Sequence, residues 1–429
     1  MAEAPQPPPA EPKPTTLEDL PMDVKLSILR FIPCEVDRVH LSHVCRAWRK
    51  VISGGVEAEA KLPSPPPRPL PWLLLPVPDP YASVSDAVCV LSGCRVHRQL
   101  TITPPGARCF GSHDGGWLFL HYGLTRLHAL LNVRTGRAHV LPSFVAPHNE
   151  VWPLHTMFIL AAALSSSPDD ASCTAIFIGA SCREPYPSCL GDGGLYIRRP
   201  HHPRRCAAYW RQGWGWACEI APHLRAEDVT YHGGSFYLLL SHGNDIYVCT
   251  PVQGGSMIKQ EERRVCPGAH QHQHHQRFRA CYLVVSSRNE LLLVKRYVLP
   301  AAPHRPMTTS EFRVFRATTR REEVPDAYAD FPVAHYPWAW IELDTLGDRM
   351  LFVGHGCSRG YEANQYPGFK GGIYFLDDGK FYEEAVLIRD RPSRPYKCYD
   401  NGNWSEGRVY RCFPTPPTSY RSAPAWLLP

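Results

Sequence analysis

The sequence predicts a small all-α module followed by a large all-β domain, best described as a β-propeller of about six blades. Three observations lead to this fold class. Apolar residues recur at helical spacing within residues 17–52, short apolar runs bounded by turn residues fill the chain after a proline-rich stretch, and 44 Pro and 31 Gly are spread over 429 residues. Such frequent punctuation matches many short strands and excludes long helices.

The first predicted helix begins at the Leu20-Pro21 pair. Pro21 is tolerated in a first helical turn because the N–H that it lacks would have no partner there, and the charge of Asp23 suits the positive end of the helix. The apolar residues between Val24 and Ile32 cover more than one helical face, and Pro33 ends the helix.

A second helix is expected to follow and to continue to residue 52, with Leu41, Val44, Trp48 and Val51 along one stripe. A unit of about 35 residues is too small to bury this much apolar surface by itself. The excess apolar surface of the first helix therefore predicts a binding partner.

This segment resembles an F-box. The resemblance rests on the Leu20-Pro21 start, the Ile28-Leu29 pair and the ending Val44-Cys45-Arg46-x-Trp48-Arg49. F-boxes dock on the Skp-type adaptor of cullin–RING ubiquitin ligases, so the resemblance implies adaptor binding and, through the adaptor, association with a cullin. The residues expected to anchor the adaptor are Leu20, Pro21, Ile28, Leu29, Val44 and Trp48. The alternative is an ordinary helical pair that packs on the rest of the chain.

The composition predicts five segments along the chain. Residues 1–16 are expected to be disordered, residues 17–52 to form the helical module, and residues 53–69 to act as a proline-rich spacer. Within this stretch PPPRPLP is also compatible with an SH3-type ligand. Residues 70–415 are assigned to the β-domain and residues 416–429 to a tail.

The β-domain is predicted from runs that read as hairpin strands, among them residues 229–251, 281–298 and 340–356. The corresponding strand starts at Ser235, Asn289 and Asp348 lie 54 and 59 residues apart. A propeller blade takes about 40–50 residues, so this spacing fits blades with longer loops. A pair of β-sandwiches is the structural alternative.

Several segments also resemble a plant-type F-box family with a C-terminal DUF295 domain, which is thought to be a propeller. The matching pieces are PWLLLP (71–76), Gly116-Trp117-Leu118, the Leu131-Asn132-x-x-Thr135-Gly136 turn and the run from 349 to 378. In that last run the family usually has Asn-Cys where this chain has Gly371-Gly372. The departure points to different local packing in that blade.

No catalytic, cofactor-binding or metal-binding residue is predicted. Residues 356–360 satisfy the GxSxG pattern around Ser358, but Pro367 and several glycines follow where a hydrolase needs a helix. The histidines His270, His272, His274 and His275 alternate with glutamine and have no rigid scaffold for a metal. The paired carboxylates Asp377-Asp378 are expected in a solvated turn.

Charge and cysteine usage restrict the remaining possibilities. The formal charge of +6 is mild, and the arginines lie in short clusters such as Arg204-Arg205 that are assigned to solvated loops, so no nucleic-acid partner is expected. No run of about 18 apolar residues occurs, and no membrane span is expected. Sixteen cysteines without a CxxC pair indicate reduced thiols, and we expect the protein in the cytoplasm or the nucleus.

Together these features predict the substrate-recognition subunit of an SCF-type (Skp–cullin–F-box) E3 ubiquitin ligase. The F-box resemblance implies adaptor docking, and the β-domain is expected to capture an unidentified protein target. The chain itself would then catalyse no reaction. Two alternatives are an F-box and propeller module that sequesters a partner without degradation, and a propeller that binds a small molecule.

Overall fold

The computed structural model describes residues 16–53, 68–76, 84–89, 98–101, 107–122, 127–148, 154–182, 204–222, 224–240, 245–252, 258–263, 265–266, 277–299, 308–320, 333–377, 396–398, 400–411, 418–419 and 422–429. It divides into two compact units, Met1–Leu70 with Gln365–Pro367, and Pro71–Asn364 with Gly368–Pro429. The predicted disorder before Thr16, most of the predicted spacer, including the start of PPPRPLP, and the histidine cluster at 270–275 lie outside the described residues.

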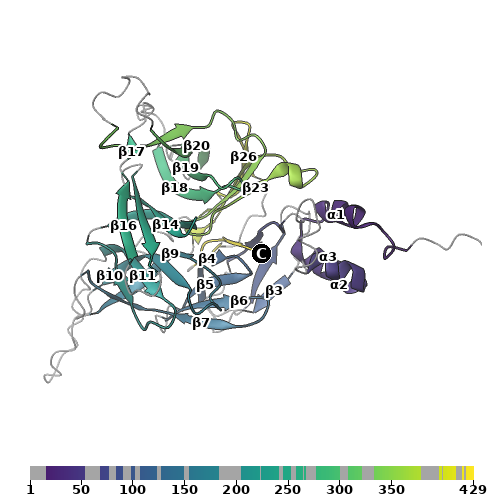
Figure 1. The fold of residues 1–429 in the computed structure, drawn as a ribbon, viewed down its shortest axis with the longest axis horizontal. Coiled ribbons are helices and arrows are strands. Elements are labelled where there is room, and N and C mark those ends of the chain that lie inside the picture. Colours follow the sequence, from purple (N-terminus) through teal and green to yellow (C-terminus); the bar gives the residue numbers. More distant parts are fainter. Residues whose placement is uncertain are drawn as a thin grey trace, which may run out of the picture. The chain divides into compact units, whose positions relative to one another are not determined.

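The first unit contains three short helices (Figure 1): α1 (Met22–Arg30), α2 (Glu35–Val44) and α3 (Arg46–Ile52). The carbonyl of Pro21 accepts the first helical hydrogen bond of α1, from the N–H of Lys25 at 3.1 Å. The side chains of Leu29, Trp48 and Val51 form the small core of the unit. Among the described residues, no helix is long and apolar enough to cross a membrane.

The prediction of one continuous second helix up to residue 52 is wrong. Cys45 has extended backbone angles, φ −157° and ψ 169°, and separates α2 from α3. In a continuous helix Val44 and Trp48 would share a face, since they are four residues apart. The break separates them instead: Val44 is 62% exposed and Trp48 is 1% exposed.

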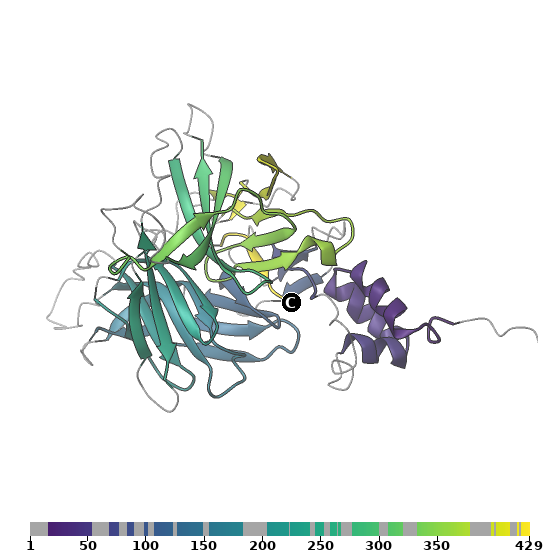
Figure 2. The ribbon, with the colours of Figure 1, turned by 45° about the horizontal axis from the view of Figure 1, so that its top comes forward.

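The second unit is built from mainly antiparallel sheets, most of them with four or five strands (Figure 2). The first sheet has the order β29-β1-β2-β3, with β29 (Ala425–Leu427), β1 (Trp72–Leu74), β2 (Val84–Val88) and β3 (Arg98–Thr101). The second has the order β4-β5-β6-β7, with β4 (Ala107–His113), β5 (Trp117–Tyr122), β6 (Leu127–Asn132) and β7 (Ala138–Leu141).

The third set runs β10-β11-β12-β8-β9 and closes on itself, because β12 pairs in parallel with β8. Its strands are β8 (Phe144–Ala146), β9 (His155–Leu164), β10 (Thr174–Cys182), β11 (Arg204–Arg211) and β12 (Ala217–Glu219). The fourth sheet has the order β13-β14-β15-β16, with β13 (Ala226–His232), β14 (Ser235–Leu240), β15 (Ile246–Pro251) and β16 (Ile258–Arg263).

The fifth sheet has the order β17-β21-β20-β19-β18, with β17 (Val265–Cys266), β18 (Arg277–Val285), β19 (Leu291–Val298), β20 (Thr309–Thr319) and β21 (Trp338–Glu342). The sixth has the order β23-β22-β24-β26-β27, with β22 (Arg349–Val353), β23 (Arg359–Glu362), β24 (Gly372–Phe375), β26 (Gly402–Ser405) and β27 (Arg408–Tyr410). A short pair, β25 (Tyr396–Lys397) with β28 (Thr418–Ser419), and a 3-10 turn, η1 (Ala363–Gln365), complete the described elements.

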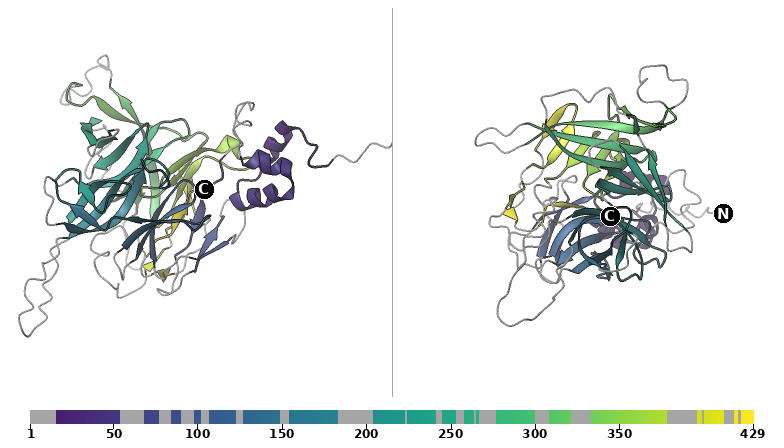
Figure 3. Two further views of the ribbon diagram at one scale, coloured as in Figure 1. Left: turned by 60° about the horizontal axis from the view of Figure 1, so that its bottom comes forward. Right: turned by 90° about the vertical axis from the view of Figure 1, so that its left-hand side faces the viewer.

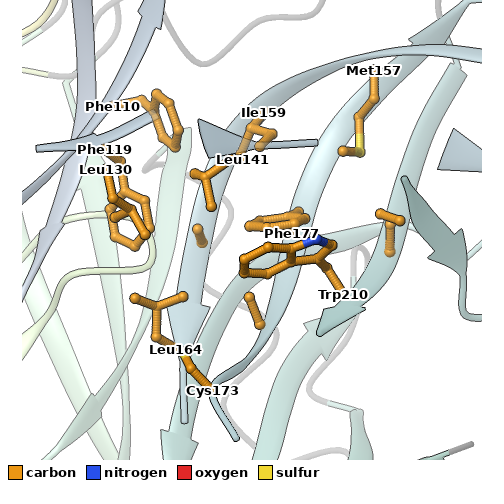
Figure 4. Packing of buried hydrophobic residues seen from close by; sticks show 14 of the residues in the cluster. Phe110, Phe119, Leu130, Leu141, Met157, Ile159, Leu164, Cys173, Phe177 and Trp210 are labelled. Carbon is orange, nitrogen blue, oxygen red and sulfur yellow. The ribbon is translucent and has the colours of Figure 1, made fainter. Parts of the chain in front are cut away.

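Neighbouring sheets share hydrophobic cores, which is the packing expected of a propeller. One core joins the β4–β7 sheet to the β8–β12 set, and Figure 4 shows its side chains packed against one another, with Phe177 6.0 Å from Trp210 between ring centroids. Further cores join the β8–β12 set to the β13–β16 sheet, that sheet to β17–β21, and β18–β20 to β22 and β24. The predicted propeller-like fold is confirmed. The described part of the chain has five open sheets of four or five strands, against about six blades expected, and the β8–β12 set closes on itself.

The last residues of the chain close this arrangement. β29 pairs with β1 in antiparallel register, with Leu73 opposite Trp426, and the yellow C-terminal strand lies beside the early strands of the same unit (Figure 3). Trp426 donates its indole N–H to the carbonyl of Val353 at 3.0 Å, and Ser112 donates its hydroxyl to the carbonyl of Trp426. The predicted tail at 416–429 is therefore corrected: it supplies a strand that links the first and last sheets.

The hairpin predictions have a mixed outcome. Residues 229–240 form the β13–β14 hairpin around Gly233-Gly234, and residues 281–298 form the β18–β19 hairpin, in which Asn289 has φ 64°. Residues 340–356 do not form a hairpin, since β21 pairs with β20 and β17 whereas β22 pairs with β23 and β24. Asp348 therefore precedes the first strand of a new sheet. The predicted 59-residue spacing from Asn289 to Asp348 does not connect equivalent strands.

Gly371 and Gly372 lie where the backbones of neighbouring segments come close. A Cβ atom on Gly371 would lie 2.1 Å from the carbonyl oxygen of Gly347, and one on Gly372 would lie 2.7 Å from the side-chain nitrogen of Asn403. Only glycine fits the first of these positions without a backbone shift. The family's usual Asn-Cys therefore could not replace this pair in the present packing.

Candidate functional site

The start of the first unit is fixed by local hydrogen bonds. The carboxylate of Asp19 accepts hydrogen bonds from the backbone N–H and the hydroxyl of Thr16, at 3.0 and 2.7 Å. These two bonds lower the pKa of Asp19 below its ordinary value of 3.8. Lys25 donates to the carbonyl of Glu18 at 2.9 Å, which ties this turn to α1.

Arg38 holds the other end of α1. Its guanidinium donates to the carbonyl of Ile32 at 2.6 Å and to the carbonyl of Leu29 at 3.2 Å, and the residue is only 5% exposed. A cation is favourable here because the last carbonyls of a helix carry partial negative charge. Arg38 is not among the residues that the sequence pattern indicates, since its only signal is its place one turn into α2, shortly after Pro33.

The outer face of α1 remains apolar. Val24, Ile28 and Phe31 follow at i, i+4 and i+7, so they lie along one side of the helix. Val24 is 38% exposed and Phe31 is 69% exposed, while Ile28 is partly buried. We call these three residues the α1 face. Other exposed apolar side chains of the same unit are Leu17, Met22, Val39 and Val44.

The six residues predicted to anchor an adaptor are not brought together on one surface. Pro21 and Val44 are exposed, and Leu20 and Ile28 are partly buried. Leu29 and Trp48 are each 1% exposed and pack on one another inside the unit. Leu29 and Trp48 therefore stabilise the core of the unit. The prediction omitted Val24 and Phe31 of the α1 face, which are exposed.

The centre of the second unit is occupied by the segment 354–360, which we call the central segment. A Cβ atom on Gly356 would lie 2.6 Å from the carbonyl oxygen of Ala162 in β9, and one on Gly360 would lie 2.8 Å from the Cα atom of Ser286, just after β18. A Cβ atom on Gly111 of β4 would lie at an ordinary contact distance, 3.8 Å, from the Cβ atom of Cys357. The segment therefore contacts β4, β9 and the residue that follows β18 at once.

Asp228 anchors the central segment. One carboxylate oxygen accepts hydrogen bonds from the N–H groups of Val229 at 2.9 Å and Gly356 at 2.7 Å, and the other accepts from Leu283 at 2.7 Å. Burial raises the pKa of Asp228 to about 6, although the nearby His355 and the three N–H groups act in the opposite direction. A buried carboxylate thus joins three segments of the propeller.

Ser358 has no geometry of a hydrolase nucleophile. Its hydroxyl donates to the carbonyl of Gly354 at 2.9 Å and accepts from the N–H of the same residue at 3.2 Å, and the residue is 3% exposed. Strand β23 follows at Arg359, where a nucleophile elbow would have a helix. The GxSxG match is a tight turn of the central segment.

Several of the remaining reactive groups among the described residues are buried or ion-paired. Burial raises the pKa of the Cys357 thiol and of the Cys281 thiol to about 12. In the described parts of the chain no group of three His, Cys, Asp or Glu side chains is placed to hold a metal ion.

The arginine pair that was expected in a solvated loop lies in a strand. Arg204 and Arg205 lie at the start of β11 and pair with Glu219 and Glu227 at 2.5 and 3.7 Å, respectively.

Comparison with known proteins provides matches in both units. Residues 17–56 match the protein-family description "F-box-like", and residues 89–401 match the "KIB1-4 beta-propeller" family. The search of curated proteins found no match.

Solved structures give weak likenesses only. Hydrazine synthase of Kuenenia stuttgartiensis is 11% identical with a TM-score of 0.29, covering 65% of this chain and 71% of the other. The N-terminal domain of Nup159 is 8% identical with a TM-score of 0.32, covering 81% and 75%. At these scores neither likeness bears on fold or function.

The two family matches confirm the F-box and propeller resemblance that the sequence motifs indicated, under a propeller family described as KIB1-4 and not as DUF295. The propeller match covers more than half of the chain and includes the strands from β3 to β25, while β1, β2 and β26 to β29 lie outside it. The chain belongs to the KIB1-4 beta-propeller family and carries an F-box-like segment at its N-terminus.

Proposed function

We propose that this protein is the substrate receptor of an SCF-type ubiquitin ligase and that the α1 face docks on the Skp-type adaptor. The supporting observation is the exposure of Val24 and Phe31, at 38% and 69%, on a unit whose core is already filled by Leu29 and Trp48. Apolar side chains aligned on one helical face, and not needed for the core of their own unit, fit a helix-docking interface.

Burial of the exposed apolar side chains can offset the free-energy cost of association with the adaptor. Burying apolar surface contributes about 25 cal/mol per Å², so a Phe side chain alone supplies about 1.5–3 kcal/mol. Several such side chains are required, because association costs at least about 4 kcal/mol in lost freedom. The further exposed residues Leu17, Met22, Val39 and Val44 are the candidates that would enlarge the buried area.

The propeller unit is proposed to hold a protein target. In this assignment the chain performs no bond chemistry, and ubiquitin transfer takes place on the partners that the adaptor brings. The closed turn at Ser358 and the high thiol pKa values are compatible with this division of labour.

The test replaces Val24 and Phe31 by Asp in the full chain and measures binding to a purified Skp-type adaptor by calorimetry. An unpaired charge in a dry interface costs several kcal/mol, so we expect binding to fall by at least about a hundredfold. The control is Val140→Asp, which places one such charge on a 74% exposed apolar residue of the propeller unit. This control should bind like the wild type.

Circular dichroism and hydrogen exchange of the helical amides check that the double variant retains its three helices. Adaptor binding at wild-type strength in a correctly folded double variant would remove the basis for the proposal. Loss of binding in the Val140→Asp control as well would show that the assay reports general damage and not the α1 face.

A further inference from the structure

The exposed side of α3 is basic. Arg46, Arg49 and Lys50 are exposed and follow at i, i+3 and i+4, so they lie along one side of the helix. We call these three residues the α3 basic face. Trp48 and Val51 lie on the opposite side and fill the core of the unit. The packing of α3 therefore directs the three cations away from the core.

The α3 basic face has no compensating negative charge within the described chain. Among the described residues, none of its three side chains takes part in an ion pair, a hydrogen bond or a ring contact. From Arg38 to Ser53 the sequence contains no Asp or Glu. Like charges at i, i+3 and i+4 destabilise a helix. The arrangement is therefore unfavourable in the free protein, and a negatively charged partner would relieve it.

The position of Arg46 strengthens this argument. The break at Cys45 makes Arg46 the first residue of α3, and no acidic residue lies in the first turn. A cation is unfavourable there, because the N-terminal end of a helix carries partial positive charge. Arg49 and Lys50 lie in the last turn and suit the helix dipole. Helix stability therefore accounts for two of the three cations and not for Arg46.

The neighbouring helix α2 adds exposed apolar and imidazole side chains. Val39 and Val44 are 43% and 62% exposed, and His40 and His43 are exposed on the same helix. Trp48 is 1% exposed, so it cannot stack on a nucleic-acid base. A single seven-residue helix also offers few phosphate contacts. A protein segment that combines carboxylates with apolar side chains fits this surface better than RNA or DNA does.

We propose that the α3 basic face binds an acidic peptide segment of a partner protein, whose Asp or Glu carboxylates pair with Arg46, Arg49 and Lys50. A guanidinium group can hold a carboxylate by two parallel hydrogen bonds, which adds geometric specificity to the attraction of charge. The exposed side chain of Val44 would contact an apolar residue of the same segment. The α3 basic face shares no residue with the α1 face, so the inference does not depend on adaptor docking.

The test measures fluorescence anisotropy with the full-length protein and a labelled peptide of four Glu-Glu-Leu repeats. The comparison probes are a labelled peptide of four Ser-Ser-Leu repeats and an oligouridylate of the same number of units. We expect the acidic peptide to bind at least about tenfold more tightly than the neutral one at low ionic strength. Its affinity should fall at least about fivefold between about 0.01 and about 0.15 M salt, because ions screen exposed charges.

Equal affinities for the two peptides, or no binding of the acidic peptide up to about 1 mM, would refute the proposal. Tighter binding of the oligouridylate than of the acidic peptide would assign the face to nucleic acid and would also overturn it.

A triple variant locates the site: Arg46→Gln, Arg49→Gln and Lys50→Gln in one chain. It should weaken the acidic peptide by at least about tenfold and remove most of the salt dependence. Circular dichroism checks that the helices remain. The single variant Arg46→Gln keeps the test decisive if the triple variant does not fold. It should weaken the acidic peptide by about threefold without lowering thermal stability, because it removes a cation from the positive end of α3.

The matched control removes the same amount of positive charge from exposed residues of the other unit: Lys370→Gln, Lys397→Gln and Arg408→Gln. It should change the affinity for the acidic peptide by less than about twofold. Phe31→Ala, on the α1 face, should bind the peptide like the wild type. Equal losses in the two triple variants would show that overall charge attracts the peptide, and would contradict a site on α3.

Discussion

The carboxylate of Asp228 accepts a 2.7 Å hydrogen bond from the backbone N–H of Gly356, a residue 128 positions later in the chain. Asp228 lies in β13, and Gly356 lies in the central segment after β22. The bond therefore connects two sheets that are not neighbours in the sequence. Because Asp228 is fully buried, its protonation state and the stability of the propeller unit are linked.

The first prediction concerns pH. The folded-state pKa of Asp228 is raised from 3.8 to about 6, so the folded protein holds this proton more tightly than the unfolded chain does. The contribution of Asp228 to the free energy of unfolding is then largest below pH 4 and is lost as the pH rises to about 6, by up to about 3 kcal/mol. Asp228→Asn cannot titrate, so the wild-type value minus the variant value should fall across this pH window.

The measurement is denaturant unfolding of the full chain from pH 4 to 7, followed by tryptophan fluorescence. Asp344→Asn, which removes an exposed carboxylate from the same unit, is the matched control and should leave the pH dependence almost unchanged. The free energy of unfolding of the wild type minus that of Asp228→Asn is the deciding quantity. If this difference stays constant or rises with pH, burial does not raise the pKa of this carboxylate.

The second prediction concerns Gly356. Its φ is +71°, and a Cβ atom would lie 2.6 Å from the carbonyl oxygen and 2.8 Å from the nitrogen of Ala162. Gly407 offers a matched control, because its φ is +76° and a Cβ atom there would have no neighbour within 4 Å. Both alanine variants carry the backbone cost of about 1–2 kcal/mol, but Gly356→Ala adds a clash with backbone atoms and should lose at least about 3 kcal/mol in total.

The free energy of unfolding of the propeller unit tests this difference. Equal losses in the two alanine variants would mean that the central segment moves freely away from β9. The hydrogen bond between Gly356 and Asp228 would then be a replaceable contact and not an anchor.

The third prediction separates core from surface in the helical unit. Trp48→Ala removes a 1% exposed side chain from a very small core, and should destabilise the unit by about 3–5 kcal/mol. Phe31→Ala removes a 69% exposed side chain, and should change stability by less than about 1 kcal/mol while weakening adaptor binding by about tenfold or more.

Hydrogen exchange of the helical amides and adaptor calorimetry, applied to both variants, give the two readouts. A Trp48→Ala protein that keeps protected helices but no longer binds the adaptor would restore Trp48 as a direct anchor. A Phe31→Ala protein with unchanged affinity would exclude Phe31 from the interface.

The features that the sequence predicts correctly have local signals. α1 ends at Arg30, shortly before Pro33, and Gly233-Gly234 and Asn289 mark turns whose positive φ values few other residues adopt. The break at Cys45 has no such signal, since no proline or glycine is present there, and it decides that Val44 faces outward while Trp48 faces inward. This is why the predicted anchor set mixed core residues with surface residues.

Strand pairing depends on distant partners and could not be predicted. The stretch around Gly347 has the same local pattern as a hairpin, yet its two flanking strands belong to different sheets. Asp377 was expected in a solvated turn but is 2% exposed and accepts a hydrogen bond from the N–H of Asp400. Asp228 directly follows Glu227 in the sequence and has no local signal of its own, because its partners Leu283 and Gly356 come from other parts of the chain.

The last prediction decides between degradation and sequestration. The full-length double variant Val24→Asp and Phe31→Asp should keep the propeller unit intact and still bind the target, because the α1 face belongs to the other unit. Without adaptor docking, this variant should shield the target from the wild-type receptor.

Isotope-pulse mass spectrometry of proteins that co-purify with both forms measures target half-life in cells. Overexpressed wild type should shorten the half-life of at least one such protein, and the double variant should lengthen the half-life of the same protein. The Val140→Asp control should act like the wild type, and proteasome inhibition should abolish the shortening. If the wild type and the double variant change target abundance in the same direction, the effect cannot depend on adaptor docking, and sequestration by the propeller becomes the better account.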